Sequence, residues 1–135
     1  MLTSAHLDEI KRRLDQISDD AKALAGLPSA EHWIMLAIQV NGCKMRLDSE
    51  RINELLGNGD INVIINQPSG CRSIATATAA TIRSELHVLI DWAREMECGP
   101  SFPDPYSKRN AVLKCQQMPS RCEYIWKLLS RITSR

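Results

Sequence analysis

The stretch 72–97, RSIATATAATIRSELHVLIDWAREME, decides the fold because it carries the longest uninterrupted helical pattern in the chain. Its apolar side chains recur in steps of four and three, at Ala75, Ala79, Ile82, Leu86, Leu89, Ala93 and Met96. That spacing gathers them into one stripe along one face of an α-helix. We therefore expect a long central helix at about 72–97, around which the other helices pack.

The N-terminal segment repeats this pattern from Ser4 to about Ala25. Its apolar stripe steps by three and four over about three heptads, at Leu7, Ile10, Leu14, Ile17, Ala21 and Leu24. Gly26 and Pro28 then end the helix. A stripe of this kind can close a bundle within one chain or pair with a second copy. We favour the second copy, and so the stripe is a predicted protein-interaction surface.

The remaining helices are predicted from the glycines and prolines that separate apolar-periodic stretches. Asn41-Gly42 divides a helix that begins after Ser29 from one at about Lys44–Leu56, although the two could form one rod. The expected inward side chains of this region are Trp33, Leu36, Ala37, Val40, Met45, Ile52, Leu55 and Leu56. Two further helices, about 107–117 and from 120 onward, are separated by Met118-Pro119, and 120–123 resembles a capping box. The last helix should bury Cys122, Ile125, Trp126, Leu129 and Ile132.

The predicted fold is all-α, an irregular antiparallel bundle of five or six helices. Residues 1–98 should form the core of the bundle and 99–106 a proline-rich linker. Residues 107–135 should form a basic helical hairpin packed on the same domain. Only 61–65, Ile-Asn-Val-Ile-Ile, looks like a strand. It has no second strand to pair with, so we interpret it as a short helical turn or an extended link.

Basic residues gather at the C-terminal end, where 107–135 holds seven Lys or Arg and one acid, Glu123. Such a cluster can neutralise phosphates, and two helices around Met118-Pro119 have the outline of a helix-turn-helix. The predicted nucleic-acid contacts are Lys108, Arg109, Lys114, Arg121, Lys127 and Arg131. The alternative is a solvated face that complements the acidic N-terminal helices, and this alternative is favoured.

A possible anion site lies where the long helix begins. A glycine-containing loop leads into a helix N-terminus, whose free N–H groups attract negative charge. The residues that would form it are Ser69, Gly70, Arg72 and Ser73. An ordinary turn followed by a serine N-cap explains the same residues and is the favoured interpretation.

Metal, cofactor and catalytic motifs are missing from the sequence. The five cysteines include no CxxC pair, the three histidines stand far apart, and no GxSxG, HExxH, Walker or GxGxxG motif occurs. The odd cysteine count, the lack of an apolar N-terminal segment and the short apolar runs indicate a cytoplasmic protein without a membrane span.

The sequence therefore predicts a non-enzymatic protein-interaction domain, an adaptor or regulator that needs no cofactor and forms a homodimer. A nucleic-acid-binding regulator is the second hypothesis. A small-anion-binding protein or enzyme with its site near Ser69–Ser73 is the third.

Overall fold

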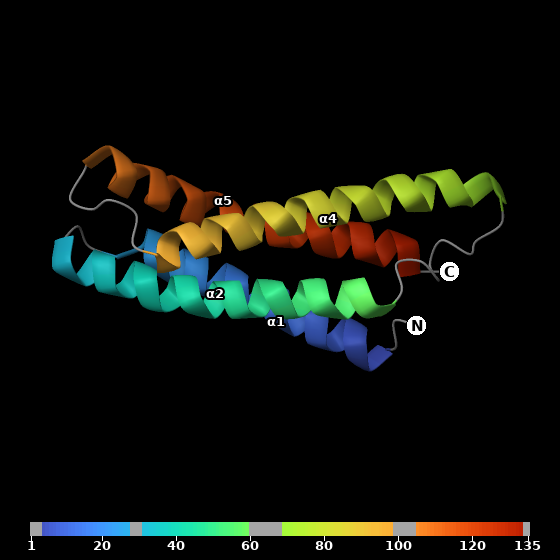
Figure 1. Cartoon of the computed structure of the whole chain (residues 1–135), viewed down its shortest axis with the longest axis horizontal. Helices are drawn as coiled ribbons and strands as arrows, with labels where there is room; N and C mark the ends of the chain where they lie inside the picture. The colour runs from blue at the N-terminus through green and yellow to red at the C-terminus, as the bar shows by residue number, and fades with distance from the viewer. Residues whose placement is uncertain (1–3, 28–30, 60–68, 99–104, 134–135) are drawn as a thin grey trace.

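The computed structural model of the chain describes the backbone of residues 4–27, 31–59, 69–98 and 105–133. Side chains are described for 4–27, 35–57, 78–98 and 109–131. All four elements in these ranges are α-helices: α1 (Ser4–Ala25), α2 (Glu31–Gly59), α4 (Ser69–Glu97) and α5 (Pro105–Thr133). They run alternately up and down, so α1 begins and α5 ends at the same end of an elongated bundle (Figure 1).

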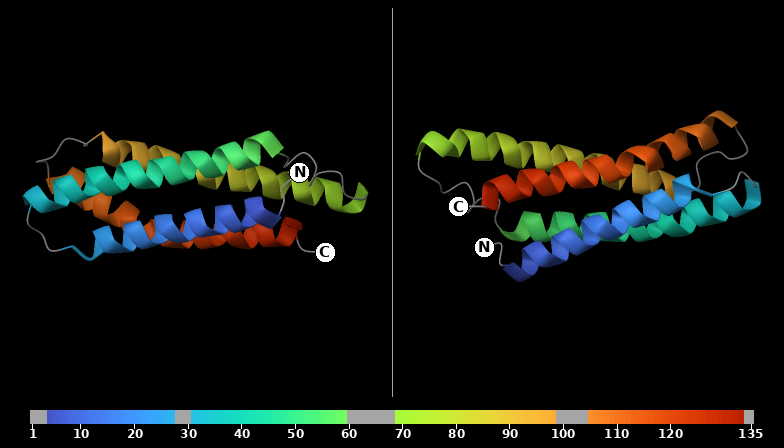
Figure 2. Two further views of the ribbon diagram at one scale, coloured as in Figure 1. Left: turned by 90° about the horizontal axis from the view of Figure 1, so that it is seen from below. Right: turned by 180° about the vertical axis from the view of Figure 1, so that it is seen from behind.

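Each helix packs against two neighbours, and the four form a ring. Helix α1 lies on α2 and α5, while α4 lies on the other sides of α2 and α5, as the three ribbon views agree (Figure 2). The prediction of one central helix is therefore wrong. Four amphipathic helices with similar stripes share one core in the middle, which is the usual solution for an antiparallel four-helix bundle.

Helix α1 has the predicted bounds and the predicted inner face. Ile10, Leu14, Ile17, Ala21 and Leu24 are all buried, and they face the core of their own chain. The predicted stripe of α4 is likewise buried from Ala79 to Met96, whereas Ala75 lies outside the described side chains. Residues 61–65, the strand-like run, also lie outside the described residues.

Helix α2 passes through Asn41-Gly42 without a break, so the two helices predicted here are one rod. Glycine costs about 1 kcal/mol relative to alanine inside a helix, which is too little to interrupt a rod that buries a long face. A Cβ atom at Gly42 would lie 2.7 Å from the backbone nitrogen of Glu97 and 2.9 Å from Cβ of Met96. The missing side chain therefore allows α2 and α4 to approach closely.

The two helices predicted on either side of Pro119 are also one, because α5 continues through it. The helix bends near its middle (Figure 2, right). Proline removes one backbone hydrogen bond and strains the preceding turn, at a cost of about 3 kcal/mol. Cys115, Met118, Cys122 and Ile125 on the two sides of Pro119 are all buried in the same core, and their packing holds the bent helix together.

Because α5 is continuous through Pro119, two other predictions for the C-terminal region are wrong. A helix-turn-helix is not formed, and Ser120 is not the start of a helix, since both of its neighbours are helical. Pro105 and Tyr106, predicted as part of the linker, belong to α5, whereas 99–104 lie outside the described residues. In the described part of the chain, no helix is long and apolar enough to cross a membrane.

We predict that Gly42→Ala lowers the free energy of unfolding by about 1–3 kcal/mol, because its methyl group must push α2 and α4 apart. Gly57→Ala is the matched control on the same helix, since a Cβ there meets no atom within 4 Å. That control should leave stability unchanged or raise it by up to about 1 kcal/mol. Urea unfolding of the two variants measures the difference, and equal stability would show that α2 and α4 are not in close contact at this point.

Candidate functional site

The predicted interaction stripe of α1 is not available as a surface. Ile10, Ile17 and Ala21 have no exposed area, and Leu14 and Leu24 have at most 5%. Leu7 is partly buried. A second chain could contact these side chains only if the bundle opened, because α2 and α5 already cover them. The regular pattern that suggested pairing between chains is thus explained by packing within one chain.

Three of the basic side chains predicted to contact nucleic acid are paired with acids. Lys114 lies 2.5 Å from Glu95, Arg121 lies 2.6 Å from Glu85, and Lys127 lies 3.2 Å from Glu123. Lys114 and Arg121 also stand 5.9 Å and 4.7 Å from the ring centre of Trp92. The interface between α4 and α5 thus takes up two of these charges. Arg109 and Arg131 are exposed, and the side chain of Lys108 lies outside the described residues.

The candidate anion site falls at the N-terminal end of α4, where Ser69, Gly70, Arg72 and Ser73 are helical. The loop predicted to lead into the helix therefore ends before Ser69. The side chains of all four residues lie outside those described, so the anion hypothesis stays a prediction.

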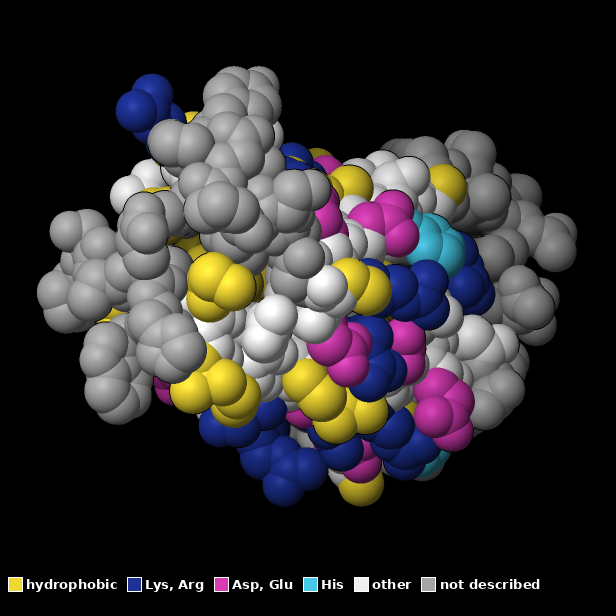
Figure 3. All heavy atoms as spheres, turned by 60° about the vertical axis from the view of Figure 1, so that its left-hand side comes forward, with side chains coloured by type: hydrophobic (Ala, Val, Ile, Leu, Met, Phe, Trp, Pro, Cys, Tyr) yellow, Lys and Arg dark blue, Asp and Glu magenta, His cyan; other side chains and the backbone are white. Residues whose placement is uncertain are grey.

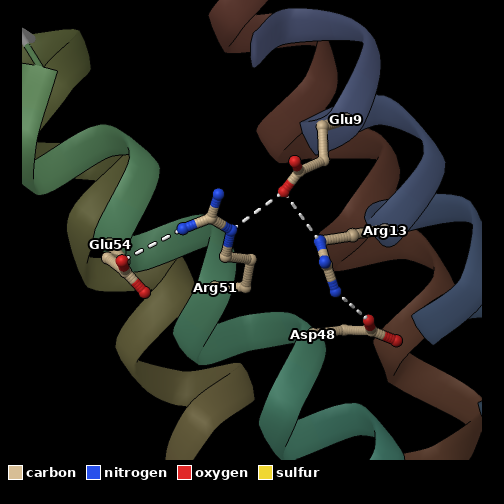
Figure 4. A network of polar contacts seen from close by, with 5 residues as sticks. All are labelled: Glu9, Arg13, Asp48, Arg51 and Glu54. Atoms are coloured by element: carbon tan, nitrogen blue, oxygen red, sulfur yellow. Dashed lines mark hydrogen bonds and ion pairs between the residues drawn. The ribbon is translucent and has the colours of Figure 1, made fainter.

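The contact between α1 and α2 is built from a chain of ion pairs (Figure 4). Glu9 accepts hydrogen bonds from Arg51 at 3.0 Å and from Arg13 at 3.1 Å, and Arg13 also donates to Asp48 at 2.8 Å. Arg51 reaches Glu54 at 3.0 Å. The hydrogen bonds from Arg51 and Arg13 lower the pKa of Glu9. Each arginine thus holds two acids, which fixes how far α2 slides along α1.

Asp20 is the exception in this contact, because it is only 8% exposed and its Oδ2 atom has no hydrogen-bond partner. Its Oδ1 atom accepts one hydrogen bond from Gln16 at 3.1 Å. Burial raises the pKa of Asp20, although Gln16 and the charge of Lys44 act in the opposite direction. Burial also raises the pKa of Asp48, against the hydrogen bond from Arg13. The charged form of Asp20 therefore lowers the stability of the folded state at neutral pH.

The contact between α2 and α4 centres on Arg46. Its guanidinium binds both carboxylate oxygens of Glu97, one of them through Nη2 at 3.0 Å, and also reaches Glu50 at 3.1 Å. Glu50 in turn accepts a hydrogen bond from Arg94 at 3.0 Å. The hydrogen bonds from Arg46 lower the pKa of Glu97. These pairs lie one turn from Gly42 and hold the close approach of the two helices in place.

The outer face of α2 carries an apolar row, of which two residues, Leu36 and Val40, were predicted to face inward. Leu36 is 51% exposed, Val40 48% and Leu47 53%, and Cys43 between them is half-buried. We call these four residues the α2 outer stripe. At 100° per residue they fall within about 60° of one another, on the side opposite to the buried Ile38, Met45 and Ile52. Several hydrophobic side chains are visible among charged ones on the face shown in Figure 3.

The sequence prediction was right for Met45, Ile52, Leu55 and Leu56, which are buried, but wrong for Leu36 and Val40, which it also placed inward. Residues 36, 40, 43 and 47 step by four, three and four, and so do the buried residues on the other side of the helix. A helix with two apolar faces gives no local indication of which face is inside. The choice depends on Gly42, which must face α4.

A pocket of about 430 Å³ lies between α1 and α5 beside Pro119. Trp126, which we predicted to be buried in the core, is only half-buried and lines this pocket. The ammonium of Lys11 stands 5.1 Å from the centre of its ring. Cys122 also lines the pocket, and burial raises its pKa to about 12. Its thiol is therefore neutral at physiological pH and not a ready nucleophile.

No group of three or more His, Cys, Asp or Glu side chains suited to a metal ion occurs among the described residues. Burial also raises the pKa of Cys115 to about 11. Its neighbour in space is Met96, 3.8 Å away, so this cysteine packs as a small apolar side chain.

Comparison of the chain with protein-family models, curated proteins and solved structures gave no match.

We predict that Asp20→Asn raises the free energy of unfolding by about 1 kcal/mol at pH 7, because it removes a poorly solvated buried charge. A raised pKa in the folded state means that stability falls as pH rises from the ordinary aspartate range through that pKa. The gain should therefore vanish near pH 3, where both states of the parent bind the proton. Asp19→Asn, the same change at an exposed neighbour, controls for net charge. Thermal unfolding between about pH 3 and pH 7 measures both, and a less stable Asp20→Asn at pH 7 would contradict the account.

Proposed function

We propose that this chain is a non-enzymatic protein-interaction domain that works through helical surfaces, and that it forms a homodimer through the α2 outer stripe. The observation that carries the proposal is this row of apolar side chains, about half exposed, along a well-packed helix. Single exposed leucines are common on protein surfaces, but an aligned row in heptad spacing is typical of a helix that packs on another helix.

A second copy of the chain fits this stripe because the spacing of its residues, four, three and four, is the same from either end of the helix. Two α2 helices that pack antiparallel about a two-fold axis bring Leu36 of each copy to Leu47 of the other. Val40 then meets Cys43 in the same way. The thiol of Cys43 also hydrogen-bonds Glu97 of its own chain, so Leu36, Val40 and Leu47 supply most of the apolar contact. The span from Leu36 to Leu47 is about 16 Å, or three helical turns.

Charge supports the same arrangement. Between residues 36 and 47 the only charged side chains are Lys44 and Arg46. Arg46 is engaged by Glu97 and Glu50 within its own chain. Lys44 is exposed beside the stripe rather than within it. Two copies can therefore approach without bringing like charges together or leaving one buried.

The alternative of a nucleic-acid-binding regulator has less support, because ion pairs with Glu85, Glu95 and Glu123 take up three of its predicted contacts. We keep the cytoplasm as the proposed location. The odd number of cysteines, without a CxxC pair, supports a reducing compartment.

We predict that the parent protein dimerises with a dissociation constant on the order of 10–100 µM, since a contact between two short helical faces is smaller than a standard interface. Leu47→Glu should weaken the dimer at least about tenfold, because it places a charge in the apolar contact. Sedimentation velocity over a concentration series measures both.

Leu113→Glu is the matched control, since Leu113 is 46% exposed but lies on α5, away from the stripe. It should dimerise like the parent. A parent that stays monomeric at several hundred micromolar would overturn the dimer, and a dimer disrupted by Leu113→Glu but not by Leu47→Glu would place it on another surface.

A further inference from the structure

A pocket lies between α1 and α5, in the region where α5 bends (Figure 2, right). Pro119, the proline inside α5, lies in its wall. Its volume of about 430 Å³ lies within the range of small-molecule sites in proteins, which is about 300–1,000 Å³. Residues of α2 do not line it, so the pocket is separate from the α2 outer stripe.

At one end of the pocket, apolar surface lies beside the ion pair of Lys11 and Asp15. The indole of Trp126 is half-buried there, and the buried side chains of Leu14 and Cys122 lie deeper. Because the thiol of Cys122 stays neutral, it adds apolar surface rather than charge. Together these groups offer a flat aromatic surface and an apolar floor, on which a ring can pack.

The other end is polar and positive. Lys22 and Ser18 lie one turn apart on α1, and Ser120 lies opposite on α5. The helices α1 and α5 run antiparallel (Figure 1). Lys11 stands 5.1 Å from the ring centre of Trp126, and Lys22 lies about three turns further along α1 in the lining of the same pocket. The two acids in the pocket are compensated, since Asp15 pairs with Lys11 at 3.3 Å and Glu123 pairs with Lys127 at 3.2 Å. No ion pair joins Lys22 to a described side chain, so its charge is available.

We propose that this pocket binds a small organic anion with a flat aromatic body and a single carboxylate or sulfonate group. The ring lies against Trp126, Leu14 and Cys122, and the anionic group is held by the ammonium of Lys22 and the hydroxyls of Ser18 and Ser120. A ligand of this class satisfies both ends of the pocket at once. A purely apolar molecule would leave Lys22 without an anionic partner. A bare inorganic anion would leave the indole of Trp126 exposed to water.

The test uses naphthalene-2-sulfonate as the probe, added to the uniformly ¹⁵N-labelled full chain and followed by amide chemical shifts. We expect saturable shifts confined to the facing sides of α1 and α5, with a dissociation constant on the order of 0.1–1 mM for a molecule of this size. Lys22→Gln should weaken binding about five- to tenfold, because it removes the positive charge while the exposed position leaves the fold intact. Lys44→Gln, the same change on α2, should bind like the parent.

Two further ligands separate the contributions. Inorganic sulfate and neutral 2-naphthol should each bind at least about fivefold more weakly than the probe, because each satisfies only one end of the pocket. Three results would overturn the proposal: no saturable shift at about 5 mM probe, equal binding by Lys22→Gln, or equal binding of either single-feature ligand. Shifts centred on the α2 outer stripe would also overturn it, since they would show that the probe binds to the exposed leucines instead.

Discussion

The close approach of α2 and α4 at Gly42 is the constraint on which the rest of the structure depends. A side chain at this position would collide with the backbone of Glu97, so residue 42 must face α4, and this requirement fixes the rotation of α2 about its own axis. Once the rotation is fixed, Ile38, Met45 and Ile52 point inward. The α2 outer stripe, on the opposite side of the helix, then faces solvent. Arg46 holds the same contact from one turn away through its two hydrogen bonds to Glu97. The interior contact between two helices thus determines which apolar row of α2 remains exposed.

The bend in α5 bears both on the packing of the core and on the pocket beside Pro119. Packing of Met118 and Cys122 into the core keeps the helix continuous through Pro119, although proline in a helix costs about 3 kcal/mol. The bent helix packs on both α1 and α4, and a pocket lies between α5 and α1 beside Pro119. Trp126 fills only part of that space, which explains why a residue on the inner side of the helix is half exposed. The same residue that strains the fold therefore also lines the site proposed for a small anion.

Much of the architecture could be predicted from periodicity, because one apolar stripe on an amphipathic helix leaves a single way to bury it. The bounds and inner faces of α1 and the described part of α4 follow from that rule alone. The rule fails where packing between segments distant in the sequence decides whether a helix continues or which of its faces is buried. Gly42 and Pro119 look locally like helix ends, but their neighbours in the fold hold the helices continuous. In α2, two apolar rows with the same spacing compete, and only the contact with α4 selects between them. The candidate surface could therefore not be located before the bundle was known, and the pocket lies at a bend that no local pattern specifies.

The central claim is that α1 uses its stripe inside the chain and leaves α2 to meet the second copy. Within one helix, the methyl groups of Leu36 and Leu47 lie about 16 Å apart, too far for a nuclear Overhauser effect. A methyl-to-methyl effect between these two residues can arise only across two copies. The most direct measurement is therefore an isotope-filtered NOESY spectrum of an equimolar mixture of labelled and unlabelled protein at a concentration that populates the dimer. We predict intermolecular cross-peaks between Leu36 and Leu47. Intermolecular cross-peaks from Leu14 or Ile17 of α1 instead would contradict this claim.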